Sequence, residues 1–185
     1  MRSTDYSPFP NAVGRNGLQA SIEVPLLIRS LNLPTGVRVL EVGCGRGIAL
    51  PVLARMLRPK DLAGLDIDAA LLTEAHYRMV ATGTNARLIH ADMRAMPFDD
   101  ASFDVVLDFG TCYHISHPAV ALQEIERVLA PRGIFVHETP VAQHLAHPIR
   151  SFGRTLPWEL VPALRRKRSA LLWSTRVRYS LPPAA

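Results

Sequence analysis

Three glycines at alternating positions are the first residues in this chain whose spacing indicates chemistry. Gly43, Gly45 and Gly47 follow an apolar run that extends from residue 37 to residue 42. Glycine lets the backbone turn sharply and lets a ligand approach where a Cβ atom would obstruct it. A buried strand, a glycine turn and the start of a helix together place backbone N–H groups toward a ligand. We therefore expect this segment to form a cofactor-binding turn.

The spacing of the glycines differs from that of a dinucleotide-binding turn. Dinucleotide-binding turns follow the pattern G-x-G-x-x-G. Here the pattern is G-x-G-x-G, because Ile48 stands where the third glycine of a dinucleotide turn belongs. An acid precedes the first glycine by two residues. The candidate cofactor-binding residues in this turn are Glu41, Gly43, Cys44, Gly45 and Gly47.

Acidic side chains also fall at or just beyond the ends of later predicted strands. Asp66 lies near the end of the strand predicted over 62–67, and Asp92 directly follows the third predicted strand. Open α/β sheets bind ligands at these carboxyl ends. A carboxylate such as Asp66 has two acceptor oxygens and can accept both hydroxyls of a ribose. Asp92 can accept from an adenine amino group, with Met93 or Ile67 packing on the ring.

These acids also have simpler interpretations. Asp66 could cap the helix predicted over 69–81, although Asp68 is better placed to do so. Asp92 could serve only to form a turn. Three other acids are interpreted as solvated turn residues or structural residues: Asp99, Asp100 and Asp104.

The elements that must position these residues alternate along the chain. Helices are predicted over 21–31, 48–57, 69–81 and 118–129, and strands over 37–42, 62–67, 86–91, 103–109 and 134–138. Strands that alternate with helices across short links predict a doubly wound, mostly parallel sheet with helices on both faces. We expect residues 1–17 to be an irregular arm and residues 131–133 to stop the last helix. Five strands are expected, and the number after the fifth is left open.

Four segments in this order resemble the class I S-adenosylmethionine-dependent methyltransferases, in particular their small-molecule type 11 pattern. They read VLEVGCGRG (39–47), GLDID (64–68), HADMRAMPFDDASFDVV (90–106) and ALQEIERVLAPRGIFV (121–136). The resemblance implies an α/β, Rossmann-like sheet of that class, which this short chain could truncate after the fifth strand. It also implies S-adenosyl-L-methionine as methyl donor. Its implied donor contacts are Glu41 at the amino acid portion, Asp66 at the ribose, Asp92 at the adenine, and Asp108 and Phe109 at the methionine portion.

The implied activity is methyl transfer to an unidentified small-molecule acceptor by in-line displacement. The nucleophile can be O, N, C or S, and a base is needed only where it must lose a proton. The chain departs from the family pattern at Arg132, where a second glycine is common, and in the short region after residue 140, which leaves the substrate-binding elements open. One alternative is a non-catalytic S-adenosylmethionine-binding or interaction protein with this fold. Two others are an NAD-dependent oxidoreductase, which the glycine spacing opposes, and a nucleic-acid methyltransferase, for which no N-P-P-Y-like motif is visible.

Tyr113 and His114 are the candidate catalytic residues, because they lie in the loop after the fourth predicted strand. A histidine there can act as a general base or orient a substrate. It can equally be a loop residue that only packs. His90 and His137 lie within predicted strands and are interpreted as structural. No histidine and cysteine spacing indicates a metal site.

The length of 185 residues fits one domain. We divide it into an N-terminal arm and helix (1–36), a cofactor-binding core (37–139) and a basic C-terminal segment (140–185). Two cysteines indicate no disulfide framework, and no secretory signal or apolar span of about 20 residues is visible. We therefore expect a cytoplasmic protein, and its oligomeric state is left open.

The net charge of +5 belongs to the C-terminal segment. Residues 141–185 hold 8 Lys/Arg and one acid, Glu159, whereas residues 1–140 hold 13 Lys/Arg and 15 Asp/Glu. This asymmetry indicates a local anionic contact and not a surface that coats nucleic acid. Two interpretations stay open. The cations are solvated while interleaved apolar residues complete the core, or the segment contacts an anionic membrane surface or recruits an anionic or lipid-like substrate.

Overall fold

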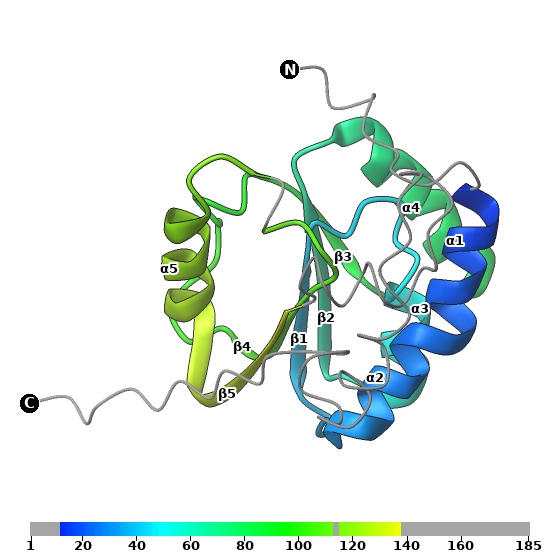
Figure 1. The fold of residues 1–185 in the computed structure, drawn as a ribbon, viewed down its shortest axis with the longest axis horizontal. Helices are drawn as coiled ribbons and strands as arrows, with labels where there is room; N and C mark the ends of the chain where they lie inside the picture. Colours follow the sequence, from blue (N-terminus) through cyan, green and yellow to red (C-terminus); the bar gives the residue numbers. More distant parts are fainter. Residues whose placement is uncertain (1–11, 113–114, 138–185) are drawn as a thin grey trace, which may run out of the picture.

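The computed structural model describes residues 12–112 and 115–137, and within them the chain forms one parallel β-sheet (Figure 1). Its strands run in the order β3-β2-β1-β4-β5, and every neighbouring pair is parallel. They are β1 (Arg38–Val42), β2 (Asp61–Asp66), β3 (Arg87–His90), β4 (Phe103–Asp108) and β5 (Leu129–His137). The strand order reverses between β1 and β4, and doubly wound sheets bind ligands at such a switch point. The predicted Rossmann-like sheet is confirmed.

Helices cover both faces of this sheet, as Figure 1 shows. They are α1 (Ala12–Leu18), the π-helical turn η2 (Gln19–Glu23), α2 (Val24–Leu31), α3 (Leu50–Leu57), α4 (Ala69–Thr82) and α5 (Pro118–Val128). Helices α2, α3 and α4 share a core with Val39 and Leu107, and α5 shares another with Leu40 and Val106. Successive strand residues point to opposite faces, so the same strands supply both cores. No helix in the described ranges is long and apolar enough to cross a membrane.

The N-terminal helix begins earlier than predicted. Residues 1–17 were expected to be an irregular arm, but α1 starts at Ala12. Pro25 falls in the first turn of α2 and has no N–H to donate to a preceding carbonyl. The wider π turn lies directly before it, where the Val24 N–H donates to the Gln19 carbonyl. The chain is therefore helical across Pro25 and is not broken there.

Strand β5 also begins earlier than predicted, at Leu129 instead of residue 134. The segment 131–133, expected to stop the helix, lies inside the strand. The register of β5 against β4 shifts between Phe103 and Val105, which leaves extra residues of β5 unpaired. Arg132 takes a φ of 65° within this bulge. A prediction from the alternation of side chains along a strand misses such a bulge, because the extra residues interrupt the alternation without ending the strand.

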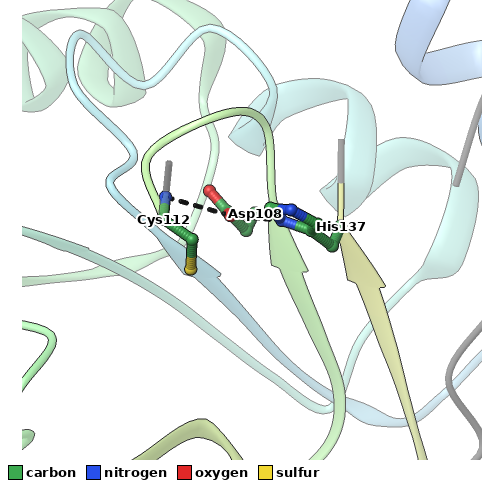
Figure 2. Close-up of side chains that lie close together, drawn as sticks. All are labelled: Asp108, Cys112 and His137. Atoms are coloured by element: carbon green, nitrogen blue, oxygen red, sulfur yellow. Dashed lines mark hydrogen bonds and ion pairs between the residues drawn. The ribbon is translucent and has the colours of Figure 1, made fainter. Parts of the chain in front are cut away.

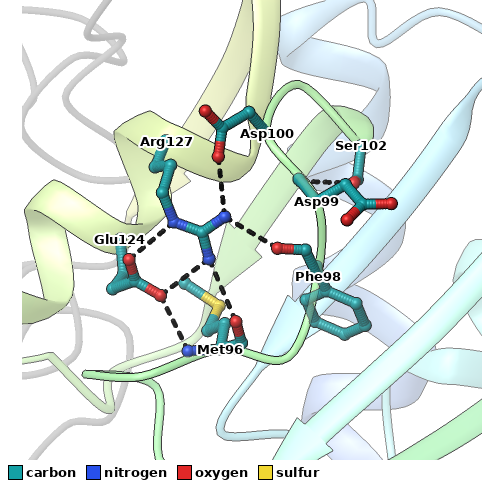
Figure 3. Close-up of polar contacts among 7 residues, drawn as sticks. All are labelled: Met96, Phe98, Asp99, Asp100, Ser102, Glu124 and Arg127. Carbon is teal, nitrogen blue, oxygen red and sulfur yellow. Dashed lines mark hydrogen bonds and ion pairs between the residues drawn. The ribbon is translucent and has the colours of Figure 1, made fainter.

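An arginine on α5 ties that helix to the link before β4, a contact that we call the Arg127 clasp (Figure 3). Its guanidinium donates to the carboxylates of Glu124 (2.7 and 2.8 Å) and Asp100 (2.9 Å). It also donates to the carbonyl oxygens of Phe98 (2.7 Å) and Met96 (3.0 Å). The hydrogen bonds from Arg127 hold the pKa of Glu124 below its usual range. Asp100 is exposed, as expected, but it is also an ion-pair partner.

A second ion pair joins β1 to β4 at the amino end of the sheet. Asp104 accepts from the Arg38 backbone N–H at 2.8 Å and from its Nη2 at 2.7 Å. These bonds lower the pKa of Asp104. The structural role expected for Asp104 is therefore confirmed.

Candidate active site

The glycine turn after β1 takes a conformation that places its three glycines in different surroundings. Gly43 and Gly47 have φ values of 65° and 66°, in the left-handed region. A Cβ atom on Gly43 would lie 1.9 Å from Thr111 Oγ1, and one on Gly47 would lie 3.0 Å from the Ala75 Cβ. These two glycines therefore let the loop after β4 and helix α4 approach the turn. A Cβ atom on Gly45 would lie 4.0 Å from Leu71 Cδ1, an ordinary van der Waals contact, so close packing does not require glycine there.

Asp66, at the end of β2, holds the glycine turn in place. Its Oδ2 accepts from the Gly45 N–H at 2.7 Å, and its Oδ1 accepts from the Asp68 N–H at 2.9 Å. Asp68 caps α4, as expected, by accepting from the N–H groups of Ala70 and Leu71. A carboxylate has about four lone-pair positions. Asp66 therefore keeps acceptor capacity on each oxygen for the hydroxyls of a ligand.

Glu41 of β1 is a buried carboxyl group with an unused oxygen. Only 3% of the residue is exposed, and its Oε2 has no hydrogen-bond partner in the part of the chain that the structure describes. Burial raises the pKa of Glu41 well above its usual range, and the charges of Asp66 and Asp108 raise it further. Leaving a buried polar atom without a partner costs about 1–3 kcal/mol. A cationic ligand group at this oxygen would offset that cost.

A cleft of about 270 Å³ opens beside the glycine turn. Small-molecule sites commonly span roughly 300–1,000 Å³, so this cleft suits part of a cofactor and not all of it. The structure brings several predicted cofactor-binding residues together around it: Glu41, Gly43, Cys44, Gly45 and Phe109. Asn16 of α1 and Gln19 of η2 line it too. Sequence reasoning missed these two, because it gave their segment no helix before residue 21.

The residues predicted to contact an adenine ring have unlike environments. Ile67 is 59% exposed beyond the end of β2, whereas Met93 is 4% exposed and packs in the core shared with α5. Of the two, Ile67 is therefore the one available to a ring. Asp92 accepts from the Arg94 backbone N–H (2.8 Å) and Nε (2.9 Å), and Arg94 lowers its pKa. Asp92 thus forms a turn, which was the simpler interpretation of this residue.

Asp108 and His137, the last residues of neighbouring strands β4 and β5, form a hydrogen-bonded pair (Figure 2). Asp108 Oδ2 lies 2.7 Å from His137 Nδ1. The buried carboxylate also accepts from the backbone N–H groups of Gly110 (3.1 Å), Thr111 (2.6 Å) and Cys112 (3.2 Å). Sequence reasoning interpreted His137 as an ordinary strand residue. Its position at the end of one strand, beside a strand that ends in an acid, was the signal that could have found the pair.

Several predicted residues lie outside the described ranges. They are Tyr113, His114 and the basic segment 140–185, and their roles stay predictions. His90, at the end of β3, has its Nε2 3.0 Å from the carbonyl oxygen of Ile67, the residue that follows β2.

The sequence of this chain is similar to a known protein family and to several of its members. The family model of the type 11 methyltransferase domain matches residues 40–137, more than half of the chain. The fatty-acid O-methyltransferase of Mycolicibacterium smegmatis is 36% identical over 102 residues, which cover 55% of this chain and 36% of that protein. The phthiotriol/phenolphthiotriol dimycocerosates methyltransferase of Mycobacterium tuberculosis is 38% identical over 100 residues, which cover 54% and 36%. The chain thus spans little more than a third of the length of these curated relatives.

Solved structures share the fold. A SAM-dependent methyltransferase from Aquifex aeolicus superposes with a TM-score of 0.61 at 18% identity, covering 88% of this chain and 88% of that one. The PH0226 protein from Pyrococcus horikoshii OT3 gives a TM-score of 0.60 at 24% identity, covering 74% of this chain and 63% of that one. At such identities the likeness shows the fold alone, and the match of the family model adds the rest. The chain therefore belongs to the type 11 methyltransferase-domain family of class I S-adenosylmethionine-dependent methyltransferases.

Proposed function

We propose that this chain transfers a methyl group from S-adenosylmethionine to a lipid-like small molecule. The observation that carries the proposal is the cleft beside the glycine turn, to which Glu41 contributes a buried carboxyl group with an unpartnered oxygen. The names of two relatives, a fatty-acid O-methyltransferase and a phthiotriol/phenolphthiotriol dimycocerosates methyltransferase, support a lipid-like acceptor.

Residues at or just beyond the carboxyl ends of β1, β2 and β3 fit different parts of the donor. Glu41 would accept from the ammonium group of the methionine portion, which supplies the cation that its free oxygen lacks. Asp66 would accept from the ribose hydroxyls with the lone pairs that Gly45 and Asp68 leave free. Ile67 offers an exposed apolar surface for the adenine ring. We keep Asp92 as a weaker candidate for the adenine amino group, because Arg94 already engages its carboxylate.

The charge of this edge of the sheet suits a cationic donor. Glu41, Asp66 and Asp108 are three buried acids, and the charges of Asp66 and Asp108 raise the pKa of Glu41. Clustered charges of one sign raise the local concentration of the opposite sign. When bound, S-adenosylmethionine supplies a methyl group already activated by a positively charged sulfur. The remaining task of the protein is to hold acceptor and donor in line and to exclude water.

The basic segment 140–185 is the part of the chain that we propose to recruit the acceptor. Its 8 Lys/Arg and single acid would attract an anionic or lipid-like molecule, or an anionic membrane surface that contains one. Such attraction weakens with salt, because exposed charges are screened within about 10 Å at 0.1 M ionic strength.

Binding and transfer test the proposal separately. Isothermal titration with S-adenosylhomocysteine should give saturable binding, and NAD, the matched control, should give none. Transfer of a labelled methyl group should then be measured on long-chain fatty acids and long-chain alcohols. Binding without transfer to any acceptor would favour the non-catalytic alternative. A protein that binds NAD but not S-adenosylhomocysteine would overturn the proposal.

A further inference from the structure

The Asp108–His137 pair lies at the carboxyl edge of the sheet, beside the strand that carries the glycine turn. In register, Asp108 pairs with Val42 of β1 on one side and with His137 of β5 on the other. Adjacent strands are about 4.8 Å apart, so His137 stands roughly 10 Å across the sheet from the end of β1. His137 therefore lies on the same edge of the sheet as the glycine turn, one strand beyond β4, although it does not line the cleft. None of the donor contacts proposed above uses its imidazole.

The hydrogen bonds around Asp108 assign the proton on the imidazole ring. Three backbone N–H groups donate to the carboxylate, so it acts as an acceptor toward its fourth partner as well. We therefore assign a proton to His137 Nδ1, which donates at 2.7 Å. In the neutral ring Nε2 then keeps its lone pair. The ring also stacks on Phe135, with centroids 5.8 Å apart and planes at 25°, and this contact further fixes its orientation.

The two side chains differ in access to solvent. The Asp108 side chain is fully buried, whereas 21% of the His137 side chain is exposed. A general base must reach the proton that it removes, but the carboxylate that orients the base need not touch the substrate. The burial therefore matches a division of roles, with Asp108 as the positioning residue and His137 as the residue that reaches outward.

A metal site is an alternative interpretation of the side chains around Asp108. Ligand atoms of Asp108, Cys112 and His137 lie within 4.8 Å of one another. Both Asp108 oxygens, however, already accept from N–H groups. Burial, and then the charge of Asp108, raise the pKa of the Cys112 thiol, which opposes the thiolate that a metal needs. The hydrogen bonds thus favour an acid–imidazole pair.

We propose that His137 is the general base of the transfer reaction, oriented by Asp108, and that the acceptor it serves is a hydroxyl group. The inference rests on the proposed methyl transfer. His137 Nε2 takes the hydroxyl proton as the acceptor oxygen bonds to the methyl carbon, and the methyl–sulfur bond breaks with its electron pair left on sulfur. The products are an ether, a neutral thioether and an imidazolium that the Asp108 carboxylate stabilises. A fatty-acid carboxylate has no proton to lose at neutral pH, so its methylation needs no base.

The test compares His137→Gln with the wild-type chain on acceptors that differ only in the reacting group. These are a long-chain alcohol and the fatty acid of equal chain length, with an alkylphenol as a second hydroxyl acceptor. His76→Gln, on the exposed surface of α4, is the matched control. We expect His137→Gln to lower kcat for the alcohol and phenol by about 10²–10⁴-fold. The fatty-acid rate, the affinity for S-adenosylhomocysteine and every property of His76→Gln should stay within about threefold.

Imidazole nitrogen NMR on the donor-free protein adds a readout that does not depend on turnover. The neutral His137 ring should carry its proton on Nδ1, and Nε2 should be the nitrogen without one. The His137→Gln spectrum should lack the signals of this ring, which assigns them to His137.

Two kinetic results would overturn the inference: a His137→Gln variant that loses kcat equally on hydroxyl and carboxylate acceptors, or one whose kcat on the alcohol falls by less than about threefold. A neutral His137 ring that carries its proton on Nε2 would overturn it too. So would a wild-type chain that binds S-adenosylhomocysteine but methylates no hydroxyl. Activity that a chelator abolishes and zinc restores would replace the base with a metal site. Failure to bind S-adenosylhomocysteine would instead overturn the proposed function itself, so the two failures are distinguishable.

Discussion

The substitution Glu41→Gln should stabilise the donor-free protein at neutral pH. The pKa of this carboxyl stands well above the usual 4.5, first because of burial and then because of Asp66 and Asp108. Below about pH 4.5 both the folded and the unfolded state hold the proton, so the ionisation of Glu41 does not lower stability there. As pH rises from there toward the folded-state pKa, only the unfolded state releases it, and stability falls by ~1.4 kcal/mol per pH unit. Glutamine does not ionise and so avoids this loss.

The same substitution should weaken donor binding. An ionised Glu41 would accept a charge-assisted hydrogen bond from the donor's ammonium group, and such bonds contribute about 1.5–3 kcal/mol. Losing it corresponds to roughly 10–150-fold in affinity. Because Glu41 must ionise to make this bond, wild-type affinity should rise with pH until the folded-state pKa is passed. The affinity of the variant should show no such rise.

Urea unfolding between about pH 4.5 and pH 7.5, combined with calorimetric titration of S-adenosylhomocysteine, measures both effects. Variant and wild type should unfold with similar free energies at the acidic end and diverge above it in favour of the variant. Glu74→Gln, an exposed acid on α4, is the control and should show neither effect. Two results would refute the proposed role of Glu41 as a buried acid that binds the donor's ammonium group. They are a difference in unfolding free energy that is equal at both ends of the pH range, and a donor affinity that the variant retains.

Three further substitutions test other parts of the molecule. Asp66→Ala should weaken S-adenosylhomocysteine binding by about 10–150-fold, since charge-assisted hydrogen bonds contribute roughly 1.5–3 kcal/mol, and an unchanged calorimetric affinity would falsify the ribose assignment. Arg127→Ala should lower the free energy of unfolding in urea by about 1–3 kcal/mol near pH 7, because two carbonyls and Glu124 lose their donor. Since Arg127 lowers the pKa of Glu124, this loss of stability should shrink as pH falls through the pKa of Glu124 in the folded state. Arg87→Ala, which removes a more exposed ion pair, is the control and should cost less than about 1 kcal/mol. Equal losses in the two variants would contradict the stabilising role of the Arg127 clasp. Arg132→Gly should raise stability in urea by up to ~1 kcal/mol, because glycine adopts a φ of 65° without strain, and destabilisation would argue against that strain.

The fold, and the gathering of Glu41, the glycine turn and Asp66 at one edge of the sheet, could be predicted because their signals are local. Glu41 and the glycine turn are consecutive with a buried strand, and Asp66 ends the next one, so strand ends alone bring them to one edge. Asp68 was recognised as the cap of α4 because it stands directly before that helix. Such features depend on the order of elements along the chain, which the alternation of strands and helices already specifies.

The histidine at this edge of the sheet could not be predicted in the same way. Asp108 and His137 are 29 residues apart, and their contact depends on β4 and β5 being neighbours in a fixed register. The bulge at Arg132 also hid where β5 begins. Asn16 and Gln19 were missed for another reason: two glycines and an asparagine in α1 are weak helix formers, and intrinsic propensity is a weak guide where tertiary contacts decide.

The thiol in the glycine turn offers a way to watch the turn move. Cys44 is buried, and a Cβ atom on Gly64 would lie only 2.9 Å from its Sγ, so the sulfur is packed tightly against β2. Burial, and then the charges of Glu41 and Asp66, raise the pKa of this thiol and keep it protonated. A covered, protonated thiol meets an alkylating reagent only during local opening of the backbone around it. The alkylation rate of Cys44 therefore reports the frequency with which the proposed donor turn opens, without any engineered label.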